Sequence, residues 1–290
     1  MKGTINVQAE NIFPIIKKFL YSDHEIFLRE LVSNAVDATT KLKTLGRLGE
    51  FTGEIGKTTI EIKIDEKKKT LHIKDSGVGM SKLEVEKYLN QVAFSGASEF
   101  LKEYEGKVEE DGIIGHFGLG FYSAFMVSKK VEVHTKTWRG EDAVKWLCDG
   151  SPEFSVTKSK KTDRGTEIIL HIDGESKEFL EEGRISEILN KYCKFLPVEI
   201  KFGTKKEYID SPTGEKDDDG KLKKESVEVD NIINNPNPIW KKSPSDLAAE
   251  DYSGFYRELY PMTFEEPLFN IHINVDYPFN LTGVLHFPKL

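Results

Sequence analysis

Four polar residues of one predicted helix can contact a phosphate group or the metal ion that accompanies it. Glu30, Asn34, Asp37 and Lys41 follow one another at intervals of four, three and four residues, which places them within roughly 60° of each other on a helix. An asparagine oxygen can bind Mg²⁺, and a carboxylate can hold a water molecule. A solvated helix face with ion pairs between turns has the same spacing, so this pattern alone leaves both interpretations open.

Two glycine-containing segments allow close approach of a flat or phosphorylated ligand. The segment 75–80 (DSGVGM) begins with an aspartate at the end of a predicted strand, where a buried carboxylate can accept a hydrogen bond from an exocyclic amine. The segment 115–121 (GHFGLGF) precedes a predicted helix, whose free N–H groups attract phosphate. Thr166 starts an alternating strand and can bind a base or an ordered water. Each of these motifs also suits an ordinary turn or strand edge.

Helices and strands must bring these residues together. We predict a helix over 22–45, opened by a capping box of Ser22 and Glu25 and ended by Gly46. Strands at 59–64 and 71–74 form a predicted hairpin, and Ser81 caps a further helix. Residues 94–120 have little periodicity and are interpreted as a long mobile segment. Later strands are expected at 130–136, 143–149, 153–158 and 166–172, and helices at 9–21, 121–127 and 176–194.

A change of composition after residue 210 predicts a second domain. Residues 1–210 are expected to form the first domain, and the charged stretch 211–225 a linker. Residues 226–290 contain a predicted helix near 245–259 and strands at 269–276 and 281–287. We expect this last portion to be the truncated beginning of a domain, because it ends abruptly.

Composition limits the classes of function. Of the 290 residues, 49 are acidic and 41 are basic, and the resulting net charge of −8 argues against a general nucleic-acid-binding protein. The two cysteines, Cys148 and Cys193, have no metal-binding spacing and suit a reducing compartment. No signal peptide is recognisable, and no apolar run approaches the ~20 residues of a membrane helix. We therefore expect a soluble cytoplasmic protein without nucleic-acid or membrane partners.

Together the motifs resemble the ATP-binding fold shared by gyrase B, heat-shock protein 90, histidine kinases and MutL. Residues 26–35 (IFLRELVSNA), 75–80 and 118–123 (GLGFYS) resemble heat-shock protein 90 chaperones in particular, and 238–240 (PIW) resembles the start of that family's middle domain. The short linker is more similar to that of the bacterial HtpG type. This resemblance implies an α+β fold, a two-layer sandwich whose mixed, mainly antiparallel sheet is covered by helices, with a lid at about 94–120 and a truncated α/β segment after it.

The resemblance also implies roles for the matching residues. Glu30 would position the water that attacks the γ-phosphate of ATP, and Asn34 would hold Mg²⁺. Asp75 would accept a hydrogen bond from the adenine amine, and Thr166 would help through a water molecule. The other matching residues are Ala38, Gly79, Met80 and Phe121, which would line the base and sugar, Gly118 and Gly120, which would offer N–H groups to phosphate, and Asp37 and Lys41 at the pocket mouth.

The function that the resemblance implies is that of an ATP-dependent chaperone. Such a protein binds ATP or ADP with Mg²⁺, couples lid closure to a change of shape and assists non-native client proteins, as a homodimer in the full-length protein. Relatives complete catalysis with a middle-domain arginine, and because no candidate precedes residue 290, we expect this chain to hydrolyse ATP slowly. Tyr88 and Phe94 depart from the pattern, since many members have asparagine and lysine there. A non-hydrolysing nucleotide sensor and a topoisomerase or mismatch-repair ATPase remain alternatives.

Overall fold

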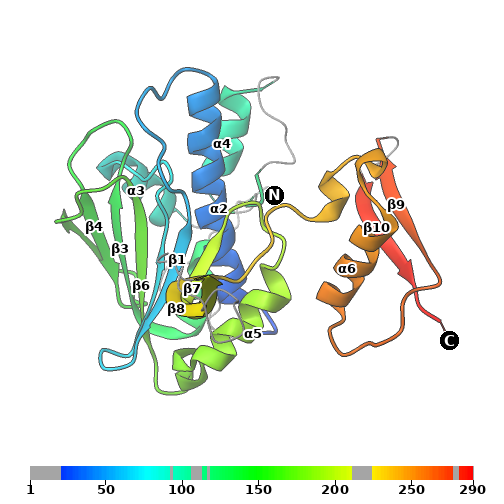
Figure 1. Cartoon of the computed structure of the whole chain (residues 1–290). Coiled ribbons are helices and arrows are strands. Elements are labelled where there is room, and N and C mark those ends of the chain that lie inside the picture. Colours follow the sequence, from blue (N-terminus) through cyan, green and yellow to red (C-terminus); the bar gives the residue numbers. More distant parts are fainter. Residues whose placement is uncertain are drawn as a thin grey trace, which may run out of the picture. The chain divides into compact units, whose positions relative to one another are not determined.

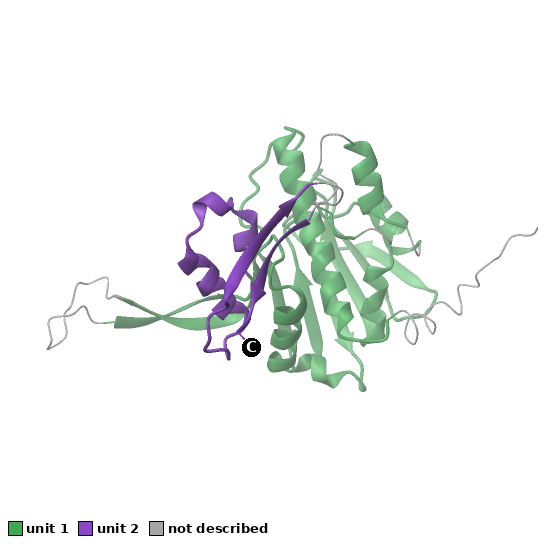
Figure 2. Cartoon of the chain, turned by 90° about the vertical axis from the view of Figure 1, so that its right-hand side faces the viewer, with its two compact units in different colours: residues 1–234 green, residues 235–290 purple. Residues whose placement is uncertain are grey.

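The computed structural model describes residues 21–91, 94–105, 113–115, 118–210, 224–276 and 281–289. The chain divides into two compact units, residues 1–234 and 235–290 (Figure 2). The predicted helix at 9–21, apart from its last residue, lies outside the described residues, as do residues 211–223 of the predicted linker. Among the helices that the structure describes, none combines the length and the apolar character needed to cross a membrane.

An eight-stranded sheet forms the frame of the first unit (Figure 1). The strand order is β5–β4–β3–β6–β2–β1–β7–β8, and every neighbouring pair is antiparallel except β1 and β7, which are parallel. The predicted α+β class with a mixed, mainly antiparallel sheet is therefore confirmed. The strands are β1 (Ile60–Asp65), β2 (Thr70–Lys74), β3 (Ser128–Lys136), β4 (Val144–Cys148), β5 (Phe154–Lys158), β6 (Gly165–Ile172), β7 (Ile200–Asp210) and β8 (Lys224–Ile232).

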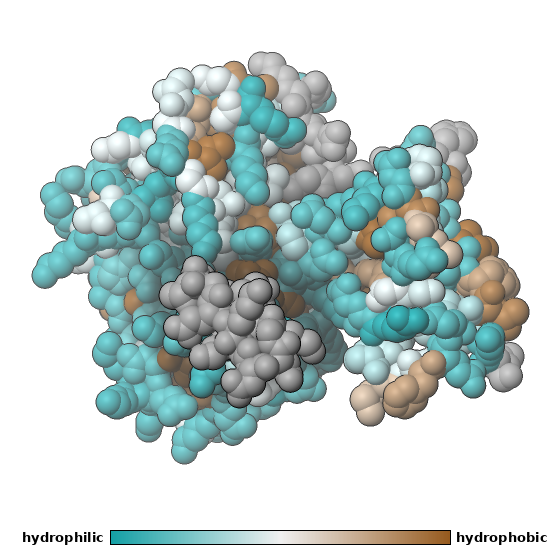
Figure 3. Space-filling view, viewed as in Figure 1, coloured by the Kyte–Doolittle hydropathy of each residue, from teal (hydrophilic) through white to brown (hydrophobic). Residues whose placement is uncertain are grey.

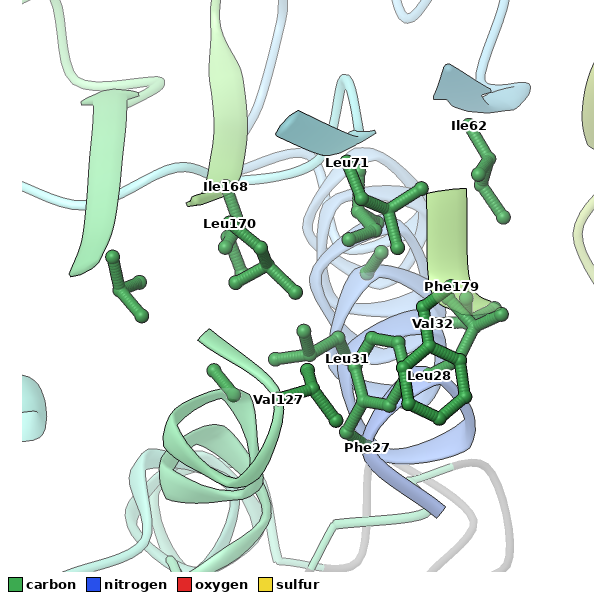
Figure 4. Packing of buried hydrophobic residues seen from close by; sticks show 14 of the residues in the cluster. Phe27, Leu28, Leu31, Val32, Ile62, Leu71, Val127, Ile168, Leu170 and Phe179 are labelled. Atoms are coloured by element: carbon green, nitrogen blue, oxygen red, sulfur yellow. The ribbon is translucent and has the colours of Figure 1, made fainter. Parts of the chain in front are cut away.

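Helix α2 (Ile26–Arg47) packs its apolar side against this sheet. Leu28, Leu31 and Val32 are fully buried and meet side chains of the central strands, among them Leu71 and Leu170 (Figure 4). These two leucines are register partners of β2 and β6, so they present one continuous apolar surface to the helix. Burying each large apolar side chain contributes roughly 1.5–3 kcal/mol, which holds α2 in one rotation about its axis.

The start of α2 differs from the prediction. The helix begins at Ile26 with Glu25 as its N-cap, and no side chain caps it. The predicted capping box of Ser22 and Glu25 is therefore wrong. Instead, Asp23 Oδ1 accepts a hydrogen bond from the Glu25 N–H at 3.1 Å.

The Glu25 carboxylate does not cap α2, because it binds side chains of helix α5 (Glu182–Tyr192). It accepts hydrogen bonds from Lys191, from the Tyr192 hydroxyl at 2.6 Å and from Arg184 at 2.8 Å. The hydrogen bonds from Lys191 and Tyr192 lower the pKa of Glu25 to about 2. This ionic cluster around the buried Glu25 joins α5 to the beginning of α2.

Local signals predicted the hairpin and the next helix correctly. Strands β1 and β2 pair in antiparallel fashion. Helix α3 (Lys82–Leu89) begins with a reciprocal capping box, because Ser81 Oγ accepts from the Glu84 N–H and the Glu84 carboxylate accepts from the Ser81 N–H. The expected helix at 121–127 is a 3₁₀ helix, Gly120–Met126, and the one at 176–194 divides into the 3₁₀ helix Lys177–Leu180 and α5.

The prediction for the lid, residues 94–120, is wrong in one part. Helix α4 (Gly96–Glu103) lies within it and is capped by Ser95, whose Oγ accepts from the Ser98 N–H at 3.4 Å. Ala97 and Phe100, three residues apart, face the cavity described below. That short apolar face was obscured by the surrounding glycine, serine and glutamate residues.

Strands β7 and β8 were missed by the sequence analysis and shift the domain boundary. They pair through residues 201–210 and 224–232 and form a ribbon that leaves the sheet beyond the short β1–β7 pairing (Figure 2). The division between the units follows Asn234, whereas the sequence analysis ended the linker at residue 225. Both strands carry many lysines and glutamates, so they lack the apolar alternation that marks a half-buried strand.

The second unit contains helix α6 (Ala249–Leu259) and the hairpin of β9 (Phe269–Val275) and β10 (Leu281–Phe287). The predicted helix near 245–259 and the two predicted strands are thus confirmed. Several large apolar side chains of this unit are exposed: Met262, Phe264, Leu268, Phe269 and Leu281. Figure 3 shows brown, apolar areas on the surface of this unit.

The packing of α2 leads to a stability prediction. We expect Leu31→Ala to lower the free energy of unfolding by about 2–5 kcal/mol, because it leaves a cavity between the helix and the sheet. Leu83→Ala is the matched control, since the Leu83 side chain is 76% exposed, and it should change stability by less than about 0.5 kcal/mol. Urea denaturation followed by tryptophan fluorescence measures both. Equal losses in the two variants would contradict this account of the core.

Candidate functional site

A cavity of about 880 Å³ lies in the first unit, bordered by α2, the loop after β2, α3 and described parts of the lid. This volume is within the range of roughly 300–1,000 Å³ typical of small-molecule sites. All the site residues expected from the sequence line this one cavity: Glu30, Asn34, Asp37, Ala38, Lys41, Asp75, Gly79, Met80, Gly118, Gly120, Phe121 and Thr166.

Strand register brings Asp75 and Thr166 together. Asp75 directly follows β2, and Thr166 lies at the start of β6, the neighbouring strand. The Asp75 N–H donates to the Thr166 carbonyl at 2.9 Å, and the Thr166 N–H donates to Asp75 Oδ1 at 3.3 Å. The Thr166 hydroxyl lies 3.0 Å from that of Thr135 on β3, and Thr135 also accepts from the Met80 N–H at 2.8 Å. Three strands therefore hold this end of the cavity in place.

Asp75 is a buried carboxylic acid in the cavity wall, with 6% of its surface exposed. Burial raises its pKa to about 6, although hydrogen bonds from Gly77 and Thr166 and the charges of Lys161 and Arg164 oppose the rise. Both backbone hydrogen bonds go to Oδ1. Among the described residues, none donates a hydrogen bond to Oδ2 in this arrangement, so this oxygen can accept from a ligand.

The two glycines after Asp75 are required by close backbone packing. A β-carbon on Gly77 would lie 2.5 Å from the carbonyl carbon of Ala38 on α2, and one on Gly79 would lie 1.9 Å from the carbonyl oxygen of Lys136. Gly79 also has a φ of +61°, which an L side chain rarely adopts. The Val78 N–H donates to the Ala38 carbonyl at 3.1 Å. The loop is thus pressed between α2 and the end of β3.

The polar stripe of α2 faces the same cavity. The Glu30 side chain is 20% exposed, and its Oε1 accepts a hydrogen bond from Arg29 at 2.6 Å. Its Oε2 lies against Gly120, where a β-carbon would come within 2.4 Å. A side chain at position 120 would therefore require the Glu30 carboxylate to move. Arg29 was not singled out from the sequence, because adjacent residues on a helix do not normally face one another.

Asn34 is the residue of this stripe that suits a magnesium ion. Among the described residues, no cluster of three or more histidines, cysteines and acids can hold a metal by itself. Mg²⁺ usually keeps several waters and takes one or two protein oxygens together with phosphate oxygens of a substrate. One amide oxygen on the cavity wall, as Asn34 provides, fits that pattern.

Asp37 and Lys41 contact the lid. Asp37 Oδ1 accepts from the Ile114 N–H and Oδ2 from the Gly115 N–H, each at 2.8 Å. Lys41 Nζ donates to the Gly96 carbonyl at 3.2 Å, and burial lowers its pKa. The sequence placed both side chains at the pocket mouth but gave no indication of these partners, which are distant along the chain.

The two residues that depart from the family pattern, Tyr88 and Phe94, also line the cavity. Their rings stack with centroids 6.0 Å apart and an interplanar angle of 16°. Lys87 Nζ lies 5.2 Å from the centre of the Phe94 ring and forms an ion pair with Glu99. The Tyr88 hydroxyl donates to Glu99 at 3.0 Å. An aromatic and ionic cluster thus joins α3 to α4.

Known proteins and protein families match this chain in sequence. A family model described as "Histidine kinase-, DNA gyrase B-, and HSP90-like ATPase" matches residues 21–164, and one described as "Hsp90 protein" matches residues 206–290. The chain is 60% identical over its full 290 residues to the chaperone protein HtpG of Bacteroides thetaiotaomicron and 58% identical to that of Porphyromonas gingivalis. It is 36% identical to that of Helicobacter pylori over 99% of its length.

The chain spans 40% of the length of the Bacteroides and Porphyromonas relatives and 45% of that of Helicobacter. The two family models follow one another along the chain in the order that the motifs predicted. The sequence matches, the mainly antiparallel sheet and the shared cavity lead to one conclusion. This chain belongs to the heat-shock protein 90 family, within its bacterial HtpG type.

Proposed function

We propose that this chain binds ATP or ADP with Mg²⁺ in the cavity beside α2 and is the nucleotide-binding part of an ATP-dependent chaperone. The observation that supports this most strongly is the convergence of Asp75 with Glu30 and Asn34 on one cavity. A buried carboxylate with a free acceptor oxygen at one end suits the adenine amine. An amide and a second carboxylate on α2 suit the phosphates, their metal ion and a water molecule.

The adenine end is defined by Asp75 and its neighbours. Asp75 Oδ2 accepts from the exocyclic amine, and Thr166 contributes through an ordered water. Gly79 has no side chain, so its backbone can approach the flat base. The same backbone packs directly on the Lys136 carbonyl oxygen. Ala38, Met80 and Phe121 supply apolar surface for the base and sugar.

The phosphate end is defined by α2 and the lid. Asn34 holds Mg²⁺ together with phosphate oxygens, and the N–H groups of Gly118 and Gly120 donate to the phosphates. Glu30 orients the attacking water, and its position against Gly120 brings that carboxylate next to the lid. Catalysis by this arrangement is positioning and electrostatic stabilisation, which requires the lid to exclude water.

The cellular role follows from the relatives. Proteins that are 58–60% identical over this whole chain are named chaperone protein HtpG. We propose that the complete protein assists non-native client proteins in the cytoplasm as a homodimer, and that lid closure couples the nucleotide to a change of shape. We expect ATP turnover by residues 1–290 to be slower than that of the complete protein.

A nucleotide sensor that does not hydrolyse ATP is the second candidate. Arg29 donates to Glu30 Oε1 through both Nε, at 3.2 Å, and Nη2, at 2.6 Å. Because Arg29 already occupies this oxygen, Glu30 has less acceptor capacity for an attacking water molecule, which favours the sensor. The Glu30 variant described next separates the two candidates.

Replacing Glu30 tests hydrolysis separately from binding. In Glu30→Ala we expect ATP and ADP to bind about as in the unaltered chain, because Asp75, Asn34 and the lid glycines remain, while hydrolysis falls by about 100-fold or more. Calorimetry measures binding and phosphate release measures turnover. Glu182→Ala, on the exposed start of α5, serves as the control and should alter neither. If Glu30→Ala hydrolyses ATP at the original rate, the assigned role is wrong and the sensor is favoured.

The titration of Asp75 tests the adenine contact. Without nucleotide, the Asp75 carboxyl should titrate near pH 6, because burial disfavours its charged form. Saturating ADP should move the midpoint downward, since an amine that donates to the carboxylate stabilises the ionised state. Carbon-13 NMR of the carboxyl group measures both. Asp65, in the β1–β2 turn, is the control and should keep its midpoint. An Asp75 midpoint that ADP leaves in place would contradict the adenine contact.

A further inference from the structure

Two residues of α2, one helical turn apart, hold the two arms of the lid. Asp37 binds the arm before Gly118, and Lys41 binds the arm that contains α4. Helix α4 lies beside α2 (Figure 1), and the Lys41 ammonium group is 5.5 Å from the centre of the Phe100 ring of α4. Both contacts involve the helix that also carries Glu30 and Asn34.

The contact of Asp37 is specific in geometry. Its two carboxylate oxygens each accept one backbone N–H, from the consecutive residues Ile114 and Gly115, at 2.8 Å. The Asp37 residue is 5% exposed, and Ile113, which precedes the pair, is 2% exposed. A hydrogen bond to an ionised carboxylate is about twice as strong as one between neutral groups. This part of the lid is therefore anchored to α2 through its backbone N–H groups.

The anchored segment borders the residue proposed for magnesium. A β-carbon on Gly115 would lie 3.1 Å from Asp37 Oδ2 and 3.4 Å from Asn34 Oδ1. Asp37 therefore determines where the lid backbone passes relative to Asn34. Both oxygens of Asp37 accept N–H groups of this segment, so a change at Asp37 is transmitted to the lid backbone.

We infer that Asp37 is a positioning residue: its carboxylate is a latch that holds Ile113–Gly115 beside Asn34, with Lys41 as the second anchor at Gly96. This inference rests on the proposed function in one respect: it assumes that the phosphate end of a nucleotide site lies near Asn34. The latch consists only of groups of the chain itself, so it can be tested without nucleotide.

Hydrogen exchange of single amides tests the latch directly. In Asp37→Asn, without nucleotide, one acceptor oxygen is replaced by an NH₂ group and the charge is lost. We expect the Ile114 and Gly115 amides to exchange at least about tenfold faster, as measured by NMR. Asp65→Asn is the matched control, because Asp65 Oδ1 accepts from the Lys68 N–H in a remote turn. It should accelerate Lys68 alone. Unchanged exchange of Ile114 and Gly115 in Asp37→Asn would overturn the latch.

A second variant approaches the same contact from the lid. Gly115→Ala adds a methyl group 3.1 Å from Asp37 Oδ2 and leaves α2 unaltered. We expect it to accelerate exchange at Ile114 and Gly115, after correction for the intrinsic exchange rate. Combined with Asp37→Asn, it should add nothing further, because both changes break one contact. Fully additive effects on the logarithm of the exchange rate would show that Asp37 and Gly115 act separately, and would overturn the proposal.

Nucleotide measurements distinguish a positioning residue from a ligand contact. We expect Asp37→Asn to lower kcat for ATP several-fold while changing the Kd for ADP by about twofold or less. A loss of ADP affinity as large as the loss of kcat would mean that Asp37 contacts nucleotide, and would overturn the positioning role. If the unaltered chain binds no nucleotide, the proposed function fails, whereas the exchange results still decide whether the latch exists.

Discussion

The burial of one side of α2 is the constraint on which the rest of the first unit depends. Because Leu28, Leu31 and Val32 are fully buried against the sheet, the helix cannot turn about its axis without exposing them. This fixed rotation directs the polar stripe from Glu30 to Lys41 into the cavity. The ionic cluster around Glu25 adds a second restraint at the beginning of the helix. Site geometry and core packing are therefore consequences of the same contact.

Close packing of the backbone at glycine residues is the second recurring feature of the cavity. Gly77 and Gly79 let the loop after β2 lie directly on α2 and on the end of β3, and Gly120 leaves room for the Glu30 carboxylate. A side chain at any of these positions would meet a neighbour within 2.5 Å. The glycines therefore serve the assembly of the cavity walls, and the exposed backbone beside a ligand follows from that assembly.

Three carboxylates of the cavity, those of Asp75, Glu30 and Asp37, have different environments. Burial raises the pKa of Asp75 to about 6. Among the described residues none donates to its Oδ2, which suits this oxygen to a neutral hydrogen-bond donor of a ligand. Glu30 is partly exposed, and its Oε1 accepts a hydrogen bond from Arg29. Asp37 binds the lid backbone through both oxygens. Residue type alone does not distinguish these three acids; the groups around each one do.

The sequence by itself determined the features that depend on neighbours within a few residues. The stripe of α2, the β1–β2 hairpin and the Ser81 cap follow from helical spacing, alternation and capping, and motif resemblance named the residues of the cavity. Only the tertiary structure decided the partners of Glu25 and Asp37, the pairing of β7 with β8 and the burial of Asp75. The physical reason is that periodicity depends only on the spacing of nearby residues. These contacts instead join residues far apart in the chain, and how closely such residues approach depends on how the whole core packs.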